Sequence, residues 1–411
     1  MKKNSVKGLA ATLALLVSHS AFATNGDILE GIGATSEALG GTGVAAPQDS
    51  LTAIVNNPAG LSFTPSADKG DATVGTTFFK PDVKAKISTP AGTLSGSSDD
   101  PVSIIPFLGL SKPLNDKWSL GFGAYGVAGL GVDYRGQGWD LNPANPGNEG
   151  DVHTAFGNLK IAPALSYKAT DNFSVGAAVQ GNYSTLDLGQ EETDALGAGL
   201  LVGATYKAGS IQIGASYTTP QKAEFEKVYN FDAFAGDTQK DDLTLEQPAI
   251  YAAGLSWEPT DTLLFEVNAK HLGWADAEGY SDFDWEDQWV YAIGAQYKAS
   301  EALALRAGFN YAQNPVAQHN GWNPQGISTV QGKQVPTFGY ELLRNVGFPA
   351  IVESHLTLGF GYQITDALAL NAAYLHAFEQ KLTSTSAGGA IGFESTLSED
   401  SLGLSLSWAF N

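Results

Sequence analysis

The 411-residue chain contains no cysteine and few positive charges. Without a thiol it can form no disulfide framework, no thiolate metal site and no cysteine nucleophile. It carries 22 lysines and arginines against 43 aspartates and glutamates, which gives a formal net charge of −21. Binding to nucleic acid requires clustered positive side chains that neutralise phosphates, so we expect no nucleic-acid partner.

Long apolar runs are also missing. No segment offers the about 18 uninterrupted apolar residues that a transmembrane helix needs. The N-terminal run GLAATLALLV follows three lysines and precedes the small-x-small triplet Ala21-Phe22-Ala23, which predicts a secretory signal peptide at residues 1–23. Its removal leaves a mature chain that begins at Thr24, with a net charge of −24, because the peptide holds three lysines and no acid.

Glycine and aromatic residues, by contrast, are abundant. The chain has 48 glycines, 10% aromatic residues and a hydrophobic fraction of 43%, with only 16% charged residues. A disordered chain would be less hydrophobic. Together with export and the lack of cysteine, this composition favours a β-barrel of the bacterial outer membrane.

Apolar and small polar residues alternate along many segments. The last of them places five apolar side chains on one face of a strand and three small ones on the other: Leu402, Leu404, Leu406, Trp408 and Phe410 against Gly403, Ser405 and Ser407. Strand side chains point to opposite faces in turn. A barrel wall requires this pattern, because its outer face meets lipid and its inner face lines the lumen.

Fourteen such segments can be placed, an even number, as a single-chain bacterial barrel requires. They lie at residues 71–90, 101–114, 118–134, 154–169, 173–188, 194–208, 210–229, 243–258, 262–279, 288–299, 302–316, 352–364, 367–383 and 400–411. Short turns alternate with longer connections, notably 135–153, 230–242, 317–351 and 384–399. An aromatic residue stands shortly before five of the short turns, where it would lie at headgroup depth: Tyr167, Tyr206, Trp257, Tyr297 and Tyr362. We therefore predict an all-β fold, a 14-stranded antiparallel transmembrane β-barrel over residues 67–411.

Residues 24–66 do not alternate. This segment is rich in glycine and alanine and has helix-like stretches at 28–39 and 50–55. It could be a small amphipathic cap or a linker. It could also be a plug, because a barrel of fourteen strands is wide enough to hold one.

Part of this segment, GIGATSEALGGTGVAAPQDSLTAIVNNPAG, resembles the N-terminal hatch of the FadL/TodX family, which transports long-chain fatty acids and other hydrophobic compounds across the outer membrane. Asn57-Pro58-Ala59 matches the family's hatch motif, and Gly60 follows it. The similarity continues through KIAPALSYKATDNFSVGAAV, QPAIYAAGLSWEPTDTLLFEV and ESHLTLGFGYQITDALALNAAY and covers nearly all of the mature chain. It implies a monomeric barrel plugged by a helical hatch at residues 24–66. Cargo would enter from outside, move to a pocket beside the hatch and leave sideways through a gap at a kink in the third strand.

The predicted third strand carries five glycines, Gly121, Gly123, Gly126, Gly129 and Gly131. Glycine inside a strand weakens pairing and often marks a bulge. On the resemblance, we expect the lateral gate around 126–131. The alternative is that these glycines relieve the curvature of the barrel. For Asn57-Pro58, the alternative to a hatch turn held against the wall is an ordinary Asn-Pro turn.

Lys160, Lys270 and Arg306 fall on lumen faces of predicted strands. Any of them could pair with the carboxylate of a fatty acid in a partly dehydrated pocket. Lumen charges could instead pair with one another, for instance Lys270 with Glu266. In that case neutral hydrocarbons would suit the pocket as well as fatty acids.

We expect no cofactor, no metal and no enzyme activity. The acidic loop SDFDWEDQW lacks the spacing and turn glycine of an EF-hand, and the histidines show no metal-binding spacing. We expect a solvated outer loop there, bridged to lipopolysaccharide by divalent ions. No Ser–His or Asp–His pairing of a barrel hydrolase is visible. The chain ends on Asn411 instead of the usual aromatic residue, yet the apolar stripe reaches Phe410, so we expect the barrel-assembly machinery to accept it.

Two functions compete. An uptake channel for hydrophobic compounds would use the N-terminal segment as a hatch, whereas a general diffusion porin for polar solutes would have an open lumen and no need of it. We predict the first.

Overall fold

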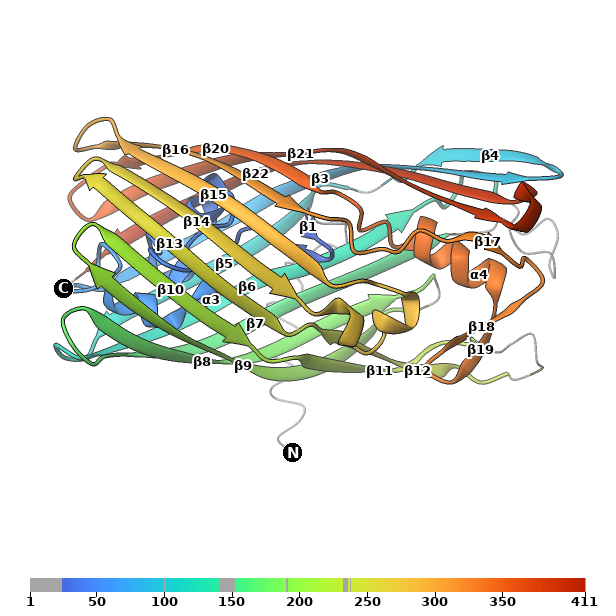
Figure 1. The fold of residues 1–411 in the computed structure, drawn as a ribbon, viewed down its shortest axis with the longest axis horizontal. Coiled ribbons are helices and arrows are strands. Elements are labelled where there is room, and N and C mark those ends of the chain that lie inside the picture. Colours follow the sequence, from blue (N-terminus) through green and yellow to red (C-terminus); the bar gives the residue numbers. More distant parts are fainter. Residues whose placement is uncertain are drawn as a thin grey trace.

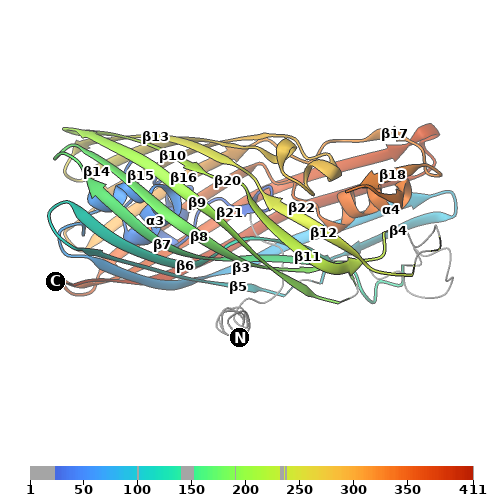
Figure 2. The same ribbon diagram turned by 90° about the horizontal axis from the view of Figure 1, so that it is seen from below.

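A computed structural model describes residues 24–99, 101–139, 152–189, 191–231, 236 and 238–410. The predicted signal peptide at 1–23 and the terminal Asn411 lie outside these residues. The described chain forms a closed barrel with its N-terminal segment inside (Figures 1 and 2). In these ranges no helix is long and apolar enough to cross a membrane.

Fourteen antiparallel strands of the described chain close the wall, as the alternation predicts. In order around the barrel they are β3 (Asp71–Thr89), β5 (Ser103–Pro113), β6 (Trp118–Asp133), β7 (His153–Lys168), β8 (Phe173–Asp187), β9 (Thr193–Ala208), β10 (Ile211–Thr218), β13 (Ile250–Thr260), β14 (Leu263–Leu272), β15 (Gln288–Lys298), β16 (Leu303–Ala312), β20 (Ser354–Gln363), β21 (Leu368–Ser386) and β22 (Gly392–Ala409). The last strand, β22, pairs with β3 and closes the ring. Short turns gather at one end, the short-turn end, and longer connections at the other, the long-loop end (Figure 1).

The remaining elements belong to the N-terminal segment and the long loops. Inside the barrel lie β1 (Thr24–Asn25), β2 (Ile28–Leu29), α2 (Ala34–Ala38), α3 (Ser50–Asn56) and η1 (Pro58–Ser62). The loops carry β4 (Gly92–Ser97), β11 (Gln221–Tyr229), β12 (Asp241–Gln247), η3 (Trp274–Asp276), η4 (Ser281–Phe283), β17 (Asn320–Trp322), β18 (Ile327–Val330), β19 (Lys333–Pro336), α4 (Thr337–Leu342), η5 (Leu343–Gly347) and η6 (Ala387–Gly389).

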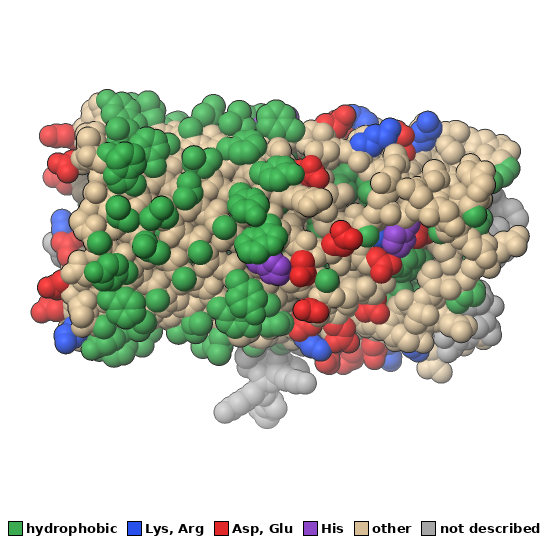
Figure 3. Space-filling model, in the orientation of Figure 1, with side chains coloured by type: hydrophobic (Ala, Val, Ile, Leu, Met, Phe, Trp, Pro, Cys, Tyr) green, Lys and Arg blue, Asp and Glu red, His purple; other side chains and the backbone are tan. Residues whose placement is uncertain are grey.

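The outer face of the wall is apolar between two rows of aromatic side chains. On β22, Trp408 is 57% exposed while the inward Ser405 is 3% exposed. The predicted row near the short turns is present, and its rings meet across strands, as Trp118 and Tyr167 do at 4.6 Å. A second row toward the long loops includes Tyr217 and Tyr251, whose ring centroids are 4.8 Å apart. The space-filling view shows this apolar band, with charged side chains gathered at both of its margins (Figure 3).

Two predicted strands, 210–229 and 243–258, are each broken in two. Thr219 and Pro220 separate β10 from β11, and Pro248 and Ala249 separate β12 from β13. Proline has no N–H with which to continue a ladder. The strands β11 and β12 therefore pair only with each other, and β11 packs on β9, where Gly197 leaves room for the backbone of Lys222.

The predicted ends of three other segments were wrong. The last strand begins at Gly392 rather than 400, the ninth ends at Leu272 rather than 279, and the expected helix at 28–39 is a short strand followed by the five-residue α2. The strands β3, β21 and β22 hold 19, 19 and 18 residues, far more than the about 9–11 that span a bilayer. Above the membrane their apolar face turns inward, where Phe393 and Leu397 pack beneath the loops.

Candidate functional site

The turn at Asn57 attaches the N-terminal segment to the barrel wall. The Asn57 amide nitrogen donates to the carbonyl oxygens of Val44 (2.8 Å) and Ala204 (3.1 Å) and to Thr205 Oγ1 (3.1 Å). Its amide oxygen accepts from the backbone N–H of Ala59 at 3.2 Å. One side chain thus joins two parts of the segment to β9.

The residues after Asn57 continue this attachment. Pro58 begins η1, where the N–H that proline lacks has no helical partner in any case. The carbonyl oxygen of Ala59 accepts from the hydroxyls of Ser166 (3.2 Å) and Ser174 (2.7 Å), on β7 and β8. At Gly60 a Cβ would lie 2.4 Å from a ring carbon of Pro47, so only glycine fits there.

Glycines of the wall leave room for the backbone of the segment. A Cβ on Gly203 would lie 2.1 Å from Asn57 Oδ1, and one on Gly308 would lie 2.2 Å from the nitrogen of Gly40. These separations are far below van der Waals contact. The segment therefore fits the lumen only because the wall is bare at these points.

A Gly308→Val substitution is expected to displace the segment and open the lumen. Overpacking of this kind costs about 1–3 kcal/mol, which shifts a docking equilibrium by roughly 5- to 150-fold. Single-channel conductance in planar bilayers should rise several-fold. Gly181→Val on β8 is the matched control, because the nearest atom to its Cβ would be 3.8 Å away. A folded Gly308→Val barrel with parental conductance would contradict this expectation.

Glu266 on β14 holds the middle of the segment. Its Oε1 accepts from the backbone N–H groups of Gly43 (3.0 Å) and Ala45 (2.9 Å), and its Oε2 from Ala46 (3.3 Å). It therefore serves the segment's backbone, and the structure has no ion pair between it and the Lys270 ammonium.

The wall is interrupted between β5 and β6, the second and third strands. Their ladder ends at the pair of Phe107 with Tyr125. The next residue of β5, Pro106, has no N–H to donate. On its other side β6 stays paired with β7, but through a bulge between Gly126 and Ala128. Beyond the bulge, β6 therefore has no partner in β5.

The gap is filled from inside by the N-terminal hairpin of β1 and β2. Ile28 of β2 pairs with Ala128, and the N–H of Gly129 donates to the carbonyl oxygen of Asp27 at 3.2 Å. The hairpin turn needs Gly26, which has φ +72°. A strand two residues long thus takes the place that β5 leaves.

The five predicted gate glycines fall into two groups. Gly121 and Gly123 are regularly paired on both sides and face the segment, where a Cβ on Gly123 would lie 3.0 Å from Ile54. Gly126, Gly129 and Gly131 lie at or beyond the bulge. Of the two groups, only Gly126, Gly129 and Gly131 lie beside the gap between β5 and β6.

An aromatic loop holds the hairpin from the long-loop end. Trp274, Tyr280 and Trp285 pack together with ring centroids 4.6 to 5.0 Å apart. A Cβ on Gly26 would lie 2.9 Å from the Trp274 ring, so the turn touches this cluster directly. The Tyr280 hydroxyl donates to the carboxylate of Asp27, which also accepts from the Gln247 amide at 3.2 Å.

Asp27 is buried inside the barrel, with 1% of its surface exposed. Burial raises the pKa of its carboxyl to about 6, although the hydrogen bonds from Tyr280 and Gln247 and the charge of Lys160 lower it. No local pattern marks this residue in the sequence, because Tyr280 and Gln247 are more than two hundred positions away.

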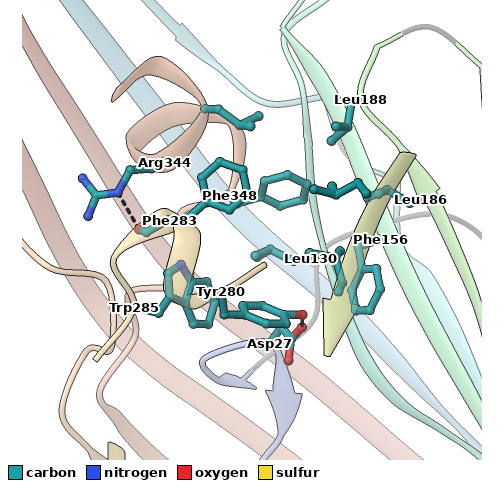
Figure 4. Close-up of a pocket in the computed structure, with 13 residues that line it drawn as sticks. Asp27, Leu130, Phe156, Leu186, Leu188, Tyr280, Phe283, Trp285, Arg344 and Phe348 are labelled. Atoms are coloured by element: carbon teal, nitrogen blue, oxygen red, sulfur yellow. Dashed lines mark hydrogen bonds between the residues drawn. The ribbon is translucent and has the colours of Figure 1, made fainter. Parts of the chain in front are cut away.

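The hairpin separates two cavities. The loop cavity, of about 530 Å³ with the space open to solvent included, lies toward the long loops, and nine of its thirteen lining residues are leucine or phenylalanine. Figure 4 shows Asp27 and Tyr280 at one edge of it and Phe348 and Leu186 facing inward. Leu343, Arg344 and Phe348 come from the 317–351 loop, and the guanidinium of Arg344 is held by the carbonyl oxygen of Phe283 at 2.6 Å.

The second space, the hatch cavity, lies between the hairpin, the segment and the wall. It measures about 850 Å³ and is partly open to solvent. Its lining is mixed: Ile28 and Leu29 of the hairpin face charged and amide side chains that include Glu30, Lys160 and Lys270. This cavity borders the gap directly, because Ile28 is also the residue that pairs with β6.

The three predicted lumen cations differ in availability. The ammonium of Lys270 donates to Asn56 Oδ1 at 3.0 Å and, more weakly, to the carbonyl oxygen of Gly41 at 3.4 Å. Arg306 donates to Gln296 (2.7 Å) and Asn371 (2.9 Å), and it lines neither cavity.

Of the three cations, Lys160 is the one that is free to bind a carboxylate of the cargo. It lines the hatch cavity, is 7% exposed, and within the described part of the chain its ammonium has no hydrogen-bond or ion-pair partner. Its charge is balanced only at longer range, by Asp27.

In the described ranges no three His, Asp or Glu side chains form a group that could hold a metal ion. In the acidic loop, Asp282 instead accepts backbone N–H groups of Gly279 (3.1 Å) and Gln331 (2.9 Å). Asp284 accepts from the Tyr340 hydroxyl at 2.7 Å. These carboxylates join the two long loops to each other.

Comparison with known proteins identifies the family of the chain and similar barrels. Residues 10–322 match the model of a family described as outer membrane protein transport protein (OMPP1/FadL/TodX). The toluene transporter TodX of Pseudomonas putida is 20% identical, with a TM-score of 0.67 over 93% of this chain and 99% of that one. A FadL homologue of Pseudomonas aeruginosa is 18% identical, with a TM-score of 0.66 over 94% and 100%. At this identity they establish the fold.

A curated relative from Chlorobium limicola, described as an uncharacterized protein in the phosphoenolpyruvate carboxykinase gene 5′ region, is 46% identical over 63 residues. That match covers 15% of this chain and 30% of the relative, so the chain spans less than a third of the curated relative it matches.

Proposed function

The chain belongs to the outer membrane protein transport protein family (OMPP1/FadL/TodX), and from this premise we propose that it admits hydrophobic compounds by diffusion and releases them sideways into the bilayer. Its place is the bacterial outer membrane, and its family consists of transport channels. The observation that carries the proposal is the gap between β5 and β6, which lies beside the hatch cavity and is filled only by the two-residue strand β2.

Lateral release is favoured by the energetics of the cargo. An apolar molecule that leaves through the lumen must enter water and loses about 0.8 kcal/mol for each CH₂ it exposes. A molecule that leaves through the wall between 126 and 131 passes from the cavity to lipid without that loss. In this proposal Ile28 leaves its partner Ala128, and the hairpin gives way while the rest of the hatch, residues 30–66, stays in the lumen. No chemical step on the cargo is required.

The two cavities support a cargo with a large apolar part. The loop cavity is lined almost entirely by apolar side chains, with Asp27 and Arg344 as its charged residues. Its leucine and phenylalanine lining suits a hydrocarbon, and TodX is described as a toluene transporter. The free ammonium of Lys160 in the hatch cavity suits a carboxylate and so favours long-chain fatty acids.

Uptake of radiolabelled oleate and toluene by cells that express the chain tests this proposal. We expect uptake above that of cells without it, with oleate favoured because of Lys160. Equal rates for both compounds would overturn the preference for fatty acids. Equal rates with and without the protein would overturn the transport function.

The alternative is a diffusion porin for polar solutes. The segment 24–66 argues against it, because its attachment by Asn57 and Glu266 leaves it inside the lumen. Low single-channel conductance in the parent would support the uptake channel, and a large steady conductance would support the porin.

We further propose that the protein works as a monomer, because the cavities, the gap and the strand that fills it all belong to one chain. The lipopolysaccharide contact of the acidic loop and recognition by the barrel-assembly machinery through Phe410 also stay proposals. The N–H of Phe410 donates to the carbonyl oxygen of Gly70 at 3.1 Å, which keeps the end of the outward stripe next to β3.

A further inference from the structure

Two glutamates of the N-terminal segment are buried together inside the barrel. Glu37 in α2 is 2% exposed and Glu30 is 3% exposed. The backbone beside Glu30 lies against that of Glu37, since a Cβ on Gly31 would lie 2.9 Å from the nitrogen of Glu37. The two carboxyls are close enough for the charge of Glu37 to act on Glu30. Glu30 lines the hatch cavity, whereas Glu37 lines neither cavity.

The wall is shaped to receive the Glu37 carboxyl. Its Oε2 accepts from Thr77 Oγ1 at 3.2 Å, and its Oε1 accepts from the hydroxyl of Ser401. At Gly403, beside them on β22, a Cβ would lie 2.3 Å from Oε2. The carboxyl therefore reaches this position only when the segment is seated in the barrel.

The surroundings supply too little positive charge for two carboxylates. The charge of Lys270 attracts Glu30, but the Lys270 ammonium donates its hydrogen bonds to Asn56 and Gly41. Lys160 on β7 also lines the hatch cavity with Glu30, but its charge is balanced by Asp27. Other ionisable side chains on the inner faces of strands next to the segment are Asp71 on β3, Glu266 on β14, Arg306 on β16, His355 on β20 and Glu399 on β22. Among these five, Arg306 is the permanent cation, and its guanidinium is bound to Gln296 and Asn371.

Burial is the main reason that the pKa of both carboxyls rises. It brings the pKa of Glu37 to about 7, against the lowering effect of the Ser401 and Thr77 hydroxyls. The pKa of Glu30 rises further above its usual range, because the charge of Glu37 adds to the effect of burial. Both groups would return to ordinary values in water.

We propose that the seated segment holds a proton on the Glu30–Glu37 pair and releases it to water when it leaves the wall, so that acid keeps the barrel plugged and alkali loosens it. A group that is more basic when seated stabilises the seated state in acid. For Glu37 this stabilisation is complete below about pH 4.5 and is lost as the pH rises through about 7. The device concerns the plug itself and does not depend on the cargo.

Thiol labelling can test this directly, since the parent chain has no cysteine. A Thr35→Cys variant places a thiol in α2, where the residue is 3% exposed, and it reacts with a water-soluble thiol reagent only when the segment leaves the wall. Its rate is divided by that of an Asp366→Cys variant in an exposed turn, which corrects for thiol ionisation. We expect this ratio to be roughly tenfold larger at about pH 8 than at about pH 6.

Substitution of either glutamate should flatten this dependence. Glu37→Gln keeps the shape and a hydrogen-bonding amide, and Glu30→Gln provides a second test if the first variant does not fold, as judged by heat-dependent gel mobility. Glu301→Gln, in an exposed turn at the short-turn end, should keep the tenfold change. A flat ratio in the parent, or an unchanged slope in a folded Glu37→Gln or Glu30→Gln barrel, would overturn the proposal. Neither outcome would bear on lateral release of cargo.

Discussion

A variant with Ile28→Cys and Ala128→Cys is expected to lose uptake when oxidised and to regain it on reduction. The two residues are partners in the antiparallel pair of β2 with β6. Partners in such a pair have Cα atoms about 4.5–5.5 Å apart, within the range that a disulfide bridges. Because the chain has no other cysteine, the new bond would be unique. It would hold β2 in the gap, and uptake of oleate should fall to the level of cells without the protein.

The matched control joins two strands that are already neighbours. Ser184 and Ala195 are partners across β8 and β9, on the inner face of the wall. A Ser184→Cys, Ala195→Cys disulfide should leave uptake unchanged, since nothing in the proposed route moves there. If the oxidised 28–128 variant carries the disulfide in full and still takes up oleate, the cargo does not leave past β2. The reduced form shows whether the substitutions themselves do harm.

The barrel is predictable from the sequence because lipid imposes one simple rule on each strand. A side chain of the outer face must be apolar, so Leu402, Leu404 and Leu406 mark β22 without any tertiary information. Where a strand leaves the membrane, this rule no longer applies and the strand can no longer be predicted from alternation. Above the membrane the outer face meets water and the inner face packs beneath loops, so the first part of β22, which includes Phe393 and Leu397, was missed.

The breaks at Pro220 and Pro248 have a signal in the sequence. A proline in the interior of a predicted wall strand argues against an unbroken ladder. Both prolines end a wall strand at the same height and turn the chain into the β11–β12 hairpin.

The hairpin in the gap could not be predicted in the same way. Ile28 lies in a glycine-rich stretch that reads as helix or loop, and its strand conformation exists only because Ala128 offers a free edge one hundred residues later. The same holds for Asp27, because its hydrogen-bond partners Tyr280 and Gln247 are far away in the sequence. The glycines of the third strand are evident in the sequence, but their division at the Gly126 bulge depends on where β5 ends.

The candidate cations show the limit of reasoning from strand faces. Alternation places Lys160, Lys270 and Arg306 in the lumen equally well. Their roles are decided by hydrogen-bond partners on other elements, which leave only Lys160 available among the described residues. The expected pair of Lys270 with Glu266 fails for the same reason, because the segment's own backbone N–H groups claim that carboxylate.

A Lys160→Met substitution is expected to weaken binding of oleate and to leave binding of toluene nearly unchanged. A hydrogen bond to a charged group contributes about 1.5–3 kcal/mol, so oleate affinity should fall roughly 10- to 150-fold. The variant should fold, because methionine fills a similar volume and the pKa of Asp27, already raised to about 6 by burial, would rise further without the Lys160 charge. Neutral Asp27 can still accept the Tyr280 hydrogen bond. Dissociation constants of the purified protein in detergent provide the measurement.

Two further variants separate charge from shape. Lys160→Arg keeps a cation in the hatch cavity and should retain most of the oleate affinity. Lys298→Met removes an exposed lysine at the short-turn end of β15 and should change neither cargo. Equal losses for oleate and toluene in Lys160→Met would mean that the lysine shapes the cavity instead of binding a carboxylate. No loss for either would mean that Lys160 does not bind the carboxylate, and the apolar loop cavity would then set the preference for cargo.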